Sequence, residues 1–359
     1  MSSRWFVGHN VRRLLSASTV APLLLLAGLA AAATRPHYGG VLRVEMRDSV
    51  ETADPPQAGA SGPARRFAEL DGAFTITHWE PGVRATYTAD DNAKGGRPFL
   101  DSVEVRMARP LRDQSIDLEL GKADIVQLGP NEIRRAPPGR KLWTSAPVRL
   151  IAVVFGPRIS DPRVRQSLAL AVDRAAIHDV LLQRQGEISG GLLPAWLSGY
   201  AFLFPAAADI AKARSLVAGL PAPARAFSLG YDPQSPTSRP IAERIALNAR
   251  DAGLLVSVGP TGANSDAHLA EVHLSTSDPA AALSEVAAAL GLPEPPRADS
   301  PEALYAAEYS LLDGFRAVPL FYLPDVYAVS PRVRTWGGPG LTPLGEWRFE
   351  NVWVEESSP

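Results

Sequence analysis

The sequence predicts an α/β protein with two domains. Its 359 residues are more than one domain usually holds. Residues 226–258 contain a strand–helix–strand pattern, and segments with the alternation of strands lie on both sides of it. Hydrophobic residues make up 46% of the chain and charged residues 21%, which is the balance of a soluble globular protein.

The strand–helix–strand unit is the clearest local pattern. Residues 226–231 and 254–258 are short apolar runs with strand character. Between them, Ile241, Ile245 and Ala249 recur at helical spacing, so residues 238–252 are expected to form a helix with one apolar face. This arrangement predicts a βαβ unit.

The other elements are expected on the same grounds. Alternation predicts strands at 39–46, 72–82, 102–107 and 318–323. Apolar spacing predicts helices at 175–185, 209–218 and 300–313, and residues 118–128 are expected to lead from a helix end into a short strand. Residues 48–70 are rich in Pro and Gly, and we expect a poorly ordered surface loop there.

Residues 161–174 combine several features that predict a helix. Asp161 suits the N-cap and Pro162 the first helical position. Val164 and Leu168 lie on one face at helical spacing and predict a buried stripe. The run reads D-P-R-V-R-Q-S-L-A-L-A-V-D-R, and most of its side chains are explained as those of an amphipathic helix packed on a sheet.

This run resembles the signature helix of the family 5 extracellular solute-binding proteins, which serve peptide and nickel ABC importers. Other segments are similar to the family's motifs: the strand at 39–44, the F-T-I-T-H-W-E-P-G run ending at Gly82, and the G-K-A-D-I run at 121–125. The V-P-L-F run at 318–321 and the end of the chain at 344–354 are similar too. The resemblance covers nearly the whole mature chain.

The resemblance implies a two-lobed periplasmic-binding-protein-like fold with mixed sheets and an inter-lobe cleft. Residues 34–154 and 329–359 would form a discontinuous first lobe, and residues 155–328 a second α/β lobe. The chain departs from the family between Met46 and Ala73, where about 26 residues stand in place of a much longer segment. We therefore expect that most of the family's accessory domain is lost.

The N-terminus predicts export. Arg4, Arg12 and Arg13 precede a short apolar run at 20–29, and four alanines follow at 30–33. This is the pattern of a signal peptide cleaved after residue 33, with a retained N-terminal anchor as the alternative. We expect a soluble periplasmic protein. The chain has no cysteine, which excludes disulfides and the lipobox cysteine of a lipoprotein.

Composition and motifs argue against catalysis and nucleic-acid binding. The net charge of −2 gives no basic footprint for a nucleic acid. The six histidines form no H-E-x-x-H or similar pair, and the nucleophile-elbow, P-loop and dinucleotide motifs are missing. We therefore expect that the protein is not an enzyme and that it binds no metal and no cofactor.

The resemblance implies a periplasmic component of an ABC importer that binds a peptide-like or other small solute in the cleft. The partner would be an inner-membrane ABC permease, and we expect a monomer. The rival interpretations are a degenerate envelope scaffold or sensor partner that no longer transports, and an envelope hydrolase.

Candidate ligand contacts come from aromatic and basic residues in predicted loops, because such loops carry function. They are Trp196, Tyr200 and Phe202 in one cluster, with Arg334 and Trp336 in another. Arg334 suits a ligand carboxylate, since a guanidinium binds it bidentately. The alternative is that the aromatic residues cover small satellite cores and that Arg334 is solvated.

Overall fold

The structure is a computed structural model of the chain. It describes residues 35–57, 60, 62–68, 70, 72–200, 203–336, 344 and 347–355. Residue contacts divide the chain into Met1–Tyr38 and Gly39–Pro359. The predicted signal peptide at 1–33 lies outside the described residues. The described strands and helices lie in the second unit.

A mixed sheet of eleven strands runs through this unit, and a two-stranded ladder lies apart from it. The strands of the main sheet are β1 (Val41–Glu45), β2 (Phe74–Glu80), β3 (Arg84–Ala89), β4 (Ser102–Arg106), β5 (Ile125–Gln127), β6 (Lys141–Phe155), β7 (Glu187–Ile188), β8 (Ala226–Tyr231), β9 (Leu255–Pro260), β10 (Ala267–His273) and β11 (Ala317–Val329). The separate ladder pairs β12 (Val333–Arg334) with β13 (Trp353–Val354). The order is β2-β3-β4-β1-β5-β11-β6-β10-β8-β9, and β7 pairs with β11.

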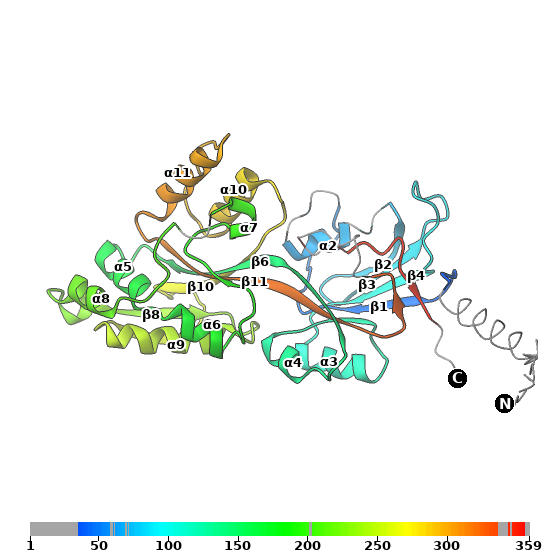
Figure 1. The fold of residues 1–359 in the computed structure, drawn as a ribbon, viewed down its shortest axis with the longest axis horizontal. Helices are drawn as coiled ribbons and strands as arrows, with labels where there is room; N and C mark the ends of the chain where they lie inside the picture. Colours follow the sequence, from blue (N-terminus) through cyan, green and yellow to red (C-terminus); the bar gives the residue numbers. More distant parts are fainter. Residues whose placement is uncertain are drawn as a thin grey trace, which may run out of the picture. The chain divides into compact units, whose positions relative to one another are not determined.

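Helices cover both faces of the sheet (Figure 1). They are η1 (Gly62–Ala64), α2 (Arg65–Ala68), α3 (Leu111–Glu119), α4 (Pro130–Arg135), α5 (Pro162–Ala171), α6 (Arg174–Val180), α7 (Ala195–Ser198), α8 (Ile210–Val217), η2 (Ala222–Arg225), α9 (Ser238–Asp251), α10 (Pro279–Ala289) and α11 (Pro301–Leu312). Asp161 accepts a hydrogen bond from the Arg163 N–H at the start of α5, as its N-cap position predicts.

The two long strands β6 and β11 divide the unit into two halves. We call β1–β5, β12, β13 and α2–α4 the first half, and β8–β10 with α5–α11 the second half. The ends of β6 and β11 belong to both halves. For this reason the contacts leave Gly39–Pro359 as one unit, and the predicted lobe boundaries at 154 and 329 stay a prediction.

The second half is a three-layer sandwich. Along β6, Ile151 and Val153 face a core that includes residues of α5 and α9. Their neighbours Leu150 and Ala152 face a core built with α10 and α11. Side chains of a strand alternate between faces, so a strand covered on both sides is apolar throughout.

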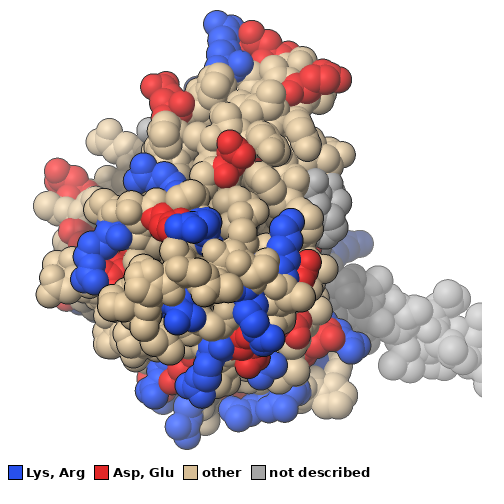
Figure 2. Space-filling view, turned by 90° about the vertical axis from the view of Figure 1, so that its left-hand side faces the viewer, with Lys and Arg blue, Asp and Glu red and all other residues tan. Residues whose placement is uncertain are grey.

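The outer sides of the helices are polar. On α9 the face opposite Ile241 and Ile245 carries Glu243 and Arg250, which are exposed. Figure 2 shows that both signs of charge are mixed over this end of the molecule, with basic side chains gathered toward its lower part. The amphipathic helices therefore keep their charges in water.

The first half has its own core, which joins distant parts of the chain. Leu42 and Val44 of β1 lie in one buried cluster with Trp347 and Phe349 near the C-terminus. A Cβ on Gly40, whose φ is +89°, would lie 2.5 Å from Val354 Cγ2. Only glycine permits this close approach of β13 to the start of β1.

The expected loop at 48–70 is only partly right, because η1 and α2 form within it. Phe67 is buried there and packs edge-to-face on Trp79, with ring centroids 5.4 Å apart. Leu70 is buried as well. These contacts bury apolar surface and hold a short helix against the sheet. The Pro and Gly content of the segment does not predict this helix.

Candidate functional site

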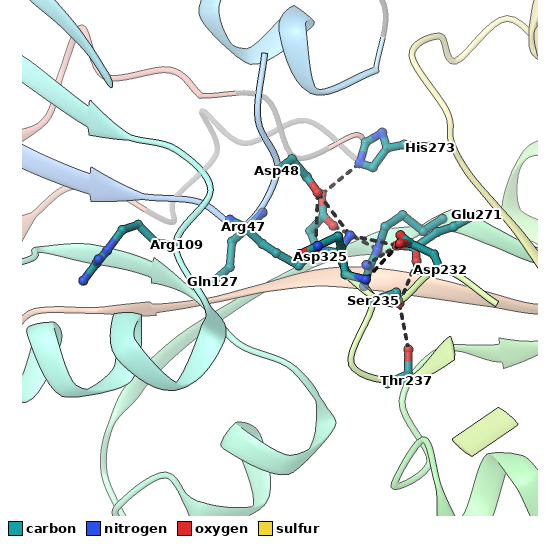
Figure 3. A network of polar contacts seen from close by, with 12 residues as sticks. Arg47, Asp48, Arg109, Gln127, Asp232, Ser235, Thr237, Glu271, His273 and Asp325 are labelled. Atoms are coloured by element: carbon teal, nitrogen blue, oxygen red, sulfur yellow. Dashed lines mark hydrogen bonds and ion pairs between the residues drawn. The ribbon is translucent and has the colours of Figure 1, made fainter. Parts of the chain in front are cut away.

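Charged side chains meet where β6 and β11 pass from one half to the other. Arg47 and Asp48 follow β1, Arg149 and Asp325 lie on the two long strands, and Glu271 lies on β10. The register places Arg149 opposite both Leu323 of β11 and His273 of β10. The sheet thus brings together residues that are more than 200 positions apart, as Figure 3 shows.

Glu271 joins the two halves. Its Oε1 lies 3.2 Å from Nη2 of Arg47 in the first half and 2.7 Å from Nη1 of Arg149. Its Oε2 accepts a hydrogen bond of 3.2 Å from the Ser235 hydroxyl, in the loop between β8 and α9. The backbone N–H of Arg47 donates to Oε1 of Gln127 over 2.6 Å, which fixes Arg47 beside β5.

Asp325 is the buried centre of the network. It accepts from Arg66 of α2 at 2.6 Å and contacts Nε2 of His273 at 2.9 Å. Arg149 Nε is 3.3 Å from its other oxygen. The side chains of Asp325 and Arg66 are only 5% and 6% exposed, so their charges depend on each other and not on water.

The network holds its carboxylates in the charged form. Burial alone would raise the pKa of Glu271, but Arg149 and Arg47 outweigh it and lower the pKa to about 2. Burial also acts against the charge of Asp325, yet Arg66 and His273 hold its pKa well below the usual range. The site is therefore a balanced set of ions at neutral pH.

A small cavity lies beside this network. Its volume is about 40 Å³, and residues from both halves line it, among them Asp48, Gly129, Arg149, Thr237 and Asp325. Ligand sites usually measure about 300–1,000 Å³. Side chains of the protein itself therefore fill the space between the two halves.

The two long strands change register at this point. Pro147 of β6 lies opposite Pro324 of β11, with register shifts on both sides of Pro324. Proline has no N–H, so neither residue can donate to the ladder. Instead, the N–H of Asp325 donates to the Ser145 hydroxyl over 2.8 Å. We call this interruption of the ladder, at Pro147 and Pro324, the hinge.

The structure places the predicted ligand contacts in separate parts of the molecule. Trp196 lies on α7, is 36% exposed, and its indole N–H donates to the Pro147 carbonyl over 2.8 Å. The Tyr200 hydroxyl donates to the buried carboxylate of Glu308. Phe202 lies outside the described residues.

The other two predicted contacts lie in the first half. Arg334 is paired bidentately with Glu355, at 2.9 and 2.8 Å. Trp336 is 2% exposed and packs on Trp143 and Tyr327, with ring centroids 5.7 Å away in each case. Trp196 alone lies beside the hinge, and a ligand role for any of these residues stays a prediction.

Sequence reasoning missed every charged residue of the network. The one available signal was an Arg-Asp pair directly after the first strand, where an α/β sheet commonly places functional groups. In the part of the chain that the structure describes, there is no group of three or more potential metal ligands. Nor does any described helix have the length and hydropathy that a membrane crossing needs.

Comparison with known proteins identifies the family. The family model described as bacterial extracellular solute-binding proteins, family 5 Middle, matches residues 29–289, which is more than half of the chain. No curated protein sequence matches significantly.

Solved structures share the fold. CtaP, an ABC transporter substrate binding protein from Listeria monocytogenes, aligns at 18% identity with a TM-score of 0.62, over 79% of this chain and 66% of its own. DppA from Helicobacter pylori, in complex with the peptide STSA, aligns at 18% identity with a TM-score of 0.64, over 79% of this chain and 63% of its own. AgaA from A. tumefacien R10, in complex with agropinic acid, aligns at 18% identity with a TM-score of 0.62, over 80% of this chain and 67% of its own.

These similarities confirm the expected two-lobed α/β fold of periplasmic binding proteins. The aligned part of this chain spans about two thirds of each of the three relatives.

Proposed function

Since this chain belongs to the bacterial extracellular solute-binding proteins of family 5, we propose that it is the binding component of an ABC importer. It takes a peptide-like or other small charged solute between its two halves and delivers the solute to a permease. The observation that carries this proposal is the charged junction at the hinge, where Arg47 and Glu271 meet across the halves.

Closure about the hinge explains how the site would work. When the halves separate, Arg47 leaves with the first half, while Glu271 and Arg149 stay with the second. Hinge closure around a ligand is an established motion of periplasmic binding proteins. A ligand ammonium would then pair with Glu271, and a ligand carboxylate with Arg47 and Arg149, in place of the present ion pair.

The ligands of two similar structures support this chemistry. DppA of Helicobacter pylori holds a peptide and AgaA holds agropinic acid. Trp196 would add an aromatic surface beside the junction, because it is partly exposed where it contacts Pro147. We further propose export to the periplasm by a cleaved signal peptide and action as a monomer.

One observation favours the scaffold alternative. The present cavity is about 40 Å³, far below the size of a peptide site, and ion pairs between the protein's own residues close it. A degenerate protein that stays closed would look the same. The two functions differ in whether any solute can separate Arg47 from Glu271.

The test begins with mass spectrometry of small molecules released from natively purified protein. Candidates, together with di- and oligopeptides, are then screened by thermal shift, since a ligand at a hundredfold excess over its Kd stabilises by about 2.7 kcal/mol. Arg47→Met and Glu271→Gln should weaken binding at least about tenfold, as expected for charged hydrogen bonds. Arg84→Met, an exposed arginine on β3, is the control.

A ligand whose affinity is the same in Arg47→Met, Glu271→Gln and Arg84→Met would show that the site is elsewhere. If no solute in the screen shifts the melting temperature and none is released from the native protein, the scaffold interpretation replaces transport.

A further inference from the structure

A second, larger cavity lies in the first half and shares Leu128 with the small cavity beside the charged network. It occupies about 300 Å³ between α3 and α4. Its floor is apolar and almost fully buried, with Leu118 at 7%, Leu128 at 9% and Ala328 at 1% exposure. This volume reaches the lower limit of the usual range for small-molecule sites.

Basic side chains surround the cavity. Arg112, Arg135 and Arg140 line it, against the two acids Glu119 and Glu132. The lining therefore has a net positive charge. Ile116 of α3 also lines it and is 42% exposed, so apolar surface continues outward beyond the floor.

Arg140 is the least exposed of the three arginines that line the cavity. Its side chain is 18% exposed, and its one ion-pair contact, to Glu119, is 4.0 Å long. Within the part of the chain that the structure describes, its guanidinium donates no hydrogen bond to another residue. A guanidinium carries five N–H donors, so Arg140 can donate to an anion that enters the cavity.

We infer that this cavity binds an amphiphilic anion. The carboxylate or phosphate head would accept hydrogen bonds from Arg140 and lie near Arg112 and Arg135. The apolar part would cover Leu118, Leu128 and Ala328 and remove them from water. A cation would meet three arginines, and a fully polar anion would leave the apolar floor uncovered, so neither fits the lining as well.

This site is separate from the proposed solute site. Leu128 lines both cavities, and the remaining residues of the two linings differ. Arg47, Asp48 and Arg149 line the small cavity alone. Removal of the Arg47–Glu271 ion pair should therefore leave the affinity of the amphiphile unchanged, even if the proposed importer function is wrong.

The experiment is calorimetric titration of the full-length mature protein with four probes of equal chain length: octanoate, octyl phosphate, octylamine and octanol. We expect octanoate or octyl phosphate to bind, and the stronger of the two identifies the head group. Octylamine and octanol should bind at least about tenfold more weakly, because the ammonium group has no acceptor and the hydroxyl group has no negative charge to pair with the arginines.

Variants locate the binding. Arg140→Gln should weaken the anion at least about tenfold. The matched control Arg134→Gln removes an exposed arginine of α4 that does not line the cavity, and it should bind like the native protein. Ala136→Phe should block binding by filling the cavity, with circular dichroism and melting temperature confirming that each variant is folded.

Three results would overturn the inference. Equal affinity for octanoate and octylamine would show unspecific hydrophobic binding. Equal losses in Arg140→Gln and Arg134→Gln would show a general charge effect. Loss of octanoate binding in Arg47→Met or Glu271→Gln would place the amphiphile in the inter-lobe junction.

Discussion

Nη2 of Arg47 lies 3.2 Å from Oε1 of Glu271, although the two residues are 224 positions apart in the sequence. Arg47 belongs to the first half and Glu271 to the second, and the hinge at Pro147 and Pro324 lies beside them. Their side chains are 23% and 26% exposed. The ion pair is therefore partly exposed to solvent, and salt can screen part of its attraction.

Arg47→Met should open the unliganded protein. The substitution removes the cation that joins the end of β1 to Glu271, while Arg149 remains to neutralise the carboxylate. We expect a larger radius of gyration by small-angle X-ray scattering, and the native protein in 1 M salt should approach it because screening weakens the pair. Arg84→Met, which removes an exposed β3 arginine, should leave the radius unchanged. A closed Arg47→Met protein would show that other contacts hold the halves.

The ion pairs of Glu271 should make stability depend on pH in acid. Its pKa is lowered from 4.5 to about 2, so its contribution is present above pH 4.5 and is lost as the pH falls toward 2. At pH 7 Glu271→Gln should cost about 1–2 kcal/mol, less than the full shift implies because the group is partly exposed. Urea unfolding at pH 7, 4.5 and 3 measures this. A stability cost of Glu271→Gln that does not become smaller as the pH falls would contradict these ion pairs.

The sequence predicted the elements with strong local patterns. The βαβ unit agrees with β8, α9 and β9 to within about two residues, and Asp161 caps α5 as expected. Their signals are local: an apolar face at helical spacing, and a carboxylate before a proline. The family motifs were equally local, and the family they implied is confirmed.

The long strands and the charged junction could not be predicted in the same way. β6 runs for 15 residues and includes Pro147 and Arg149, which interrupt any strand pattern. β10 contains Glu271 and two histidines on a strand that is half buried. Their stability comes from pairing with strands far away in the sequence, and no window of one sequence contains that information.

Asp325→Asn should be among the most destabilising substitutions in the chain. Its carboxylate is 5% exposed and pairs with Arg66, which is buried as well. The amide removes the short ion pair and leaves the Arg66 guanidinium with only its longer contact to Asp48, at 3.5 Å, so we expect a cost of about 3–5 kcal/mol. Asp299→Asn is the control, since Asp299 and its partner Arg297 are 76% and 89% exposed, and it should change stability by less than about 0.5 kcal/mol. Equal urea midpoints for the two variants would show that Arg66 does not depend on Asp325.

Glu308→Gln should give the opposite result, although Glu308 is as deeply buried as Asp325. Its carboxylate accepts from the N–H groups of Leu192 and Leu193 and from the Tyr200 hydroxyl, and has no basic partner among the described residues. Burial raises its pKa despite these donors. A carboxyl with a raised pKa stabilises the fold most below its usual value, and this contribution is lost as the pH rises through the raised pKa.

Above its raised pKa the carboxyl of Glu308 is a buried charge, which glutamine removes with little change of side-chain shape. We expect Glu308→Gln to cost less than about 1 kcal/mol at pH 8, where Asp325→Asn costs about 3–5. The native protein should gain stability relative to Glu308→Gln as the pH falls from 8 to 4.5, while it loses stability relative to Glu271→Gln below pH 4.5. Urea unfolding of the three proteins across this range separates the two carboxylates. A cost for Glu308→Gln that grows with pH would mean that Glu308 has a cationic partner in solution.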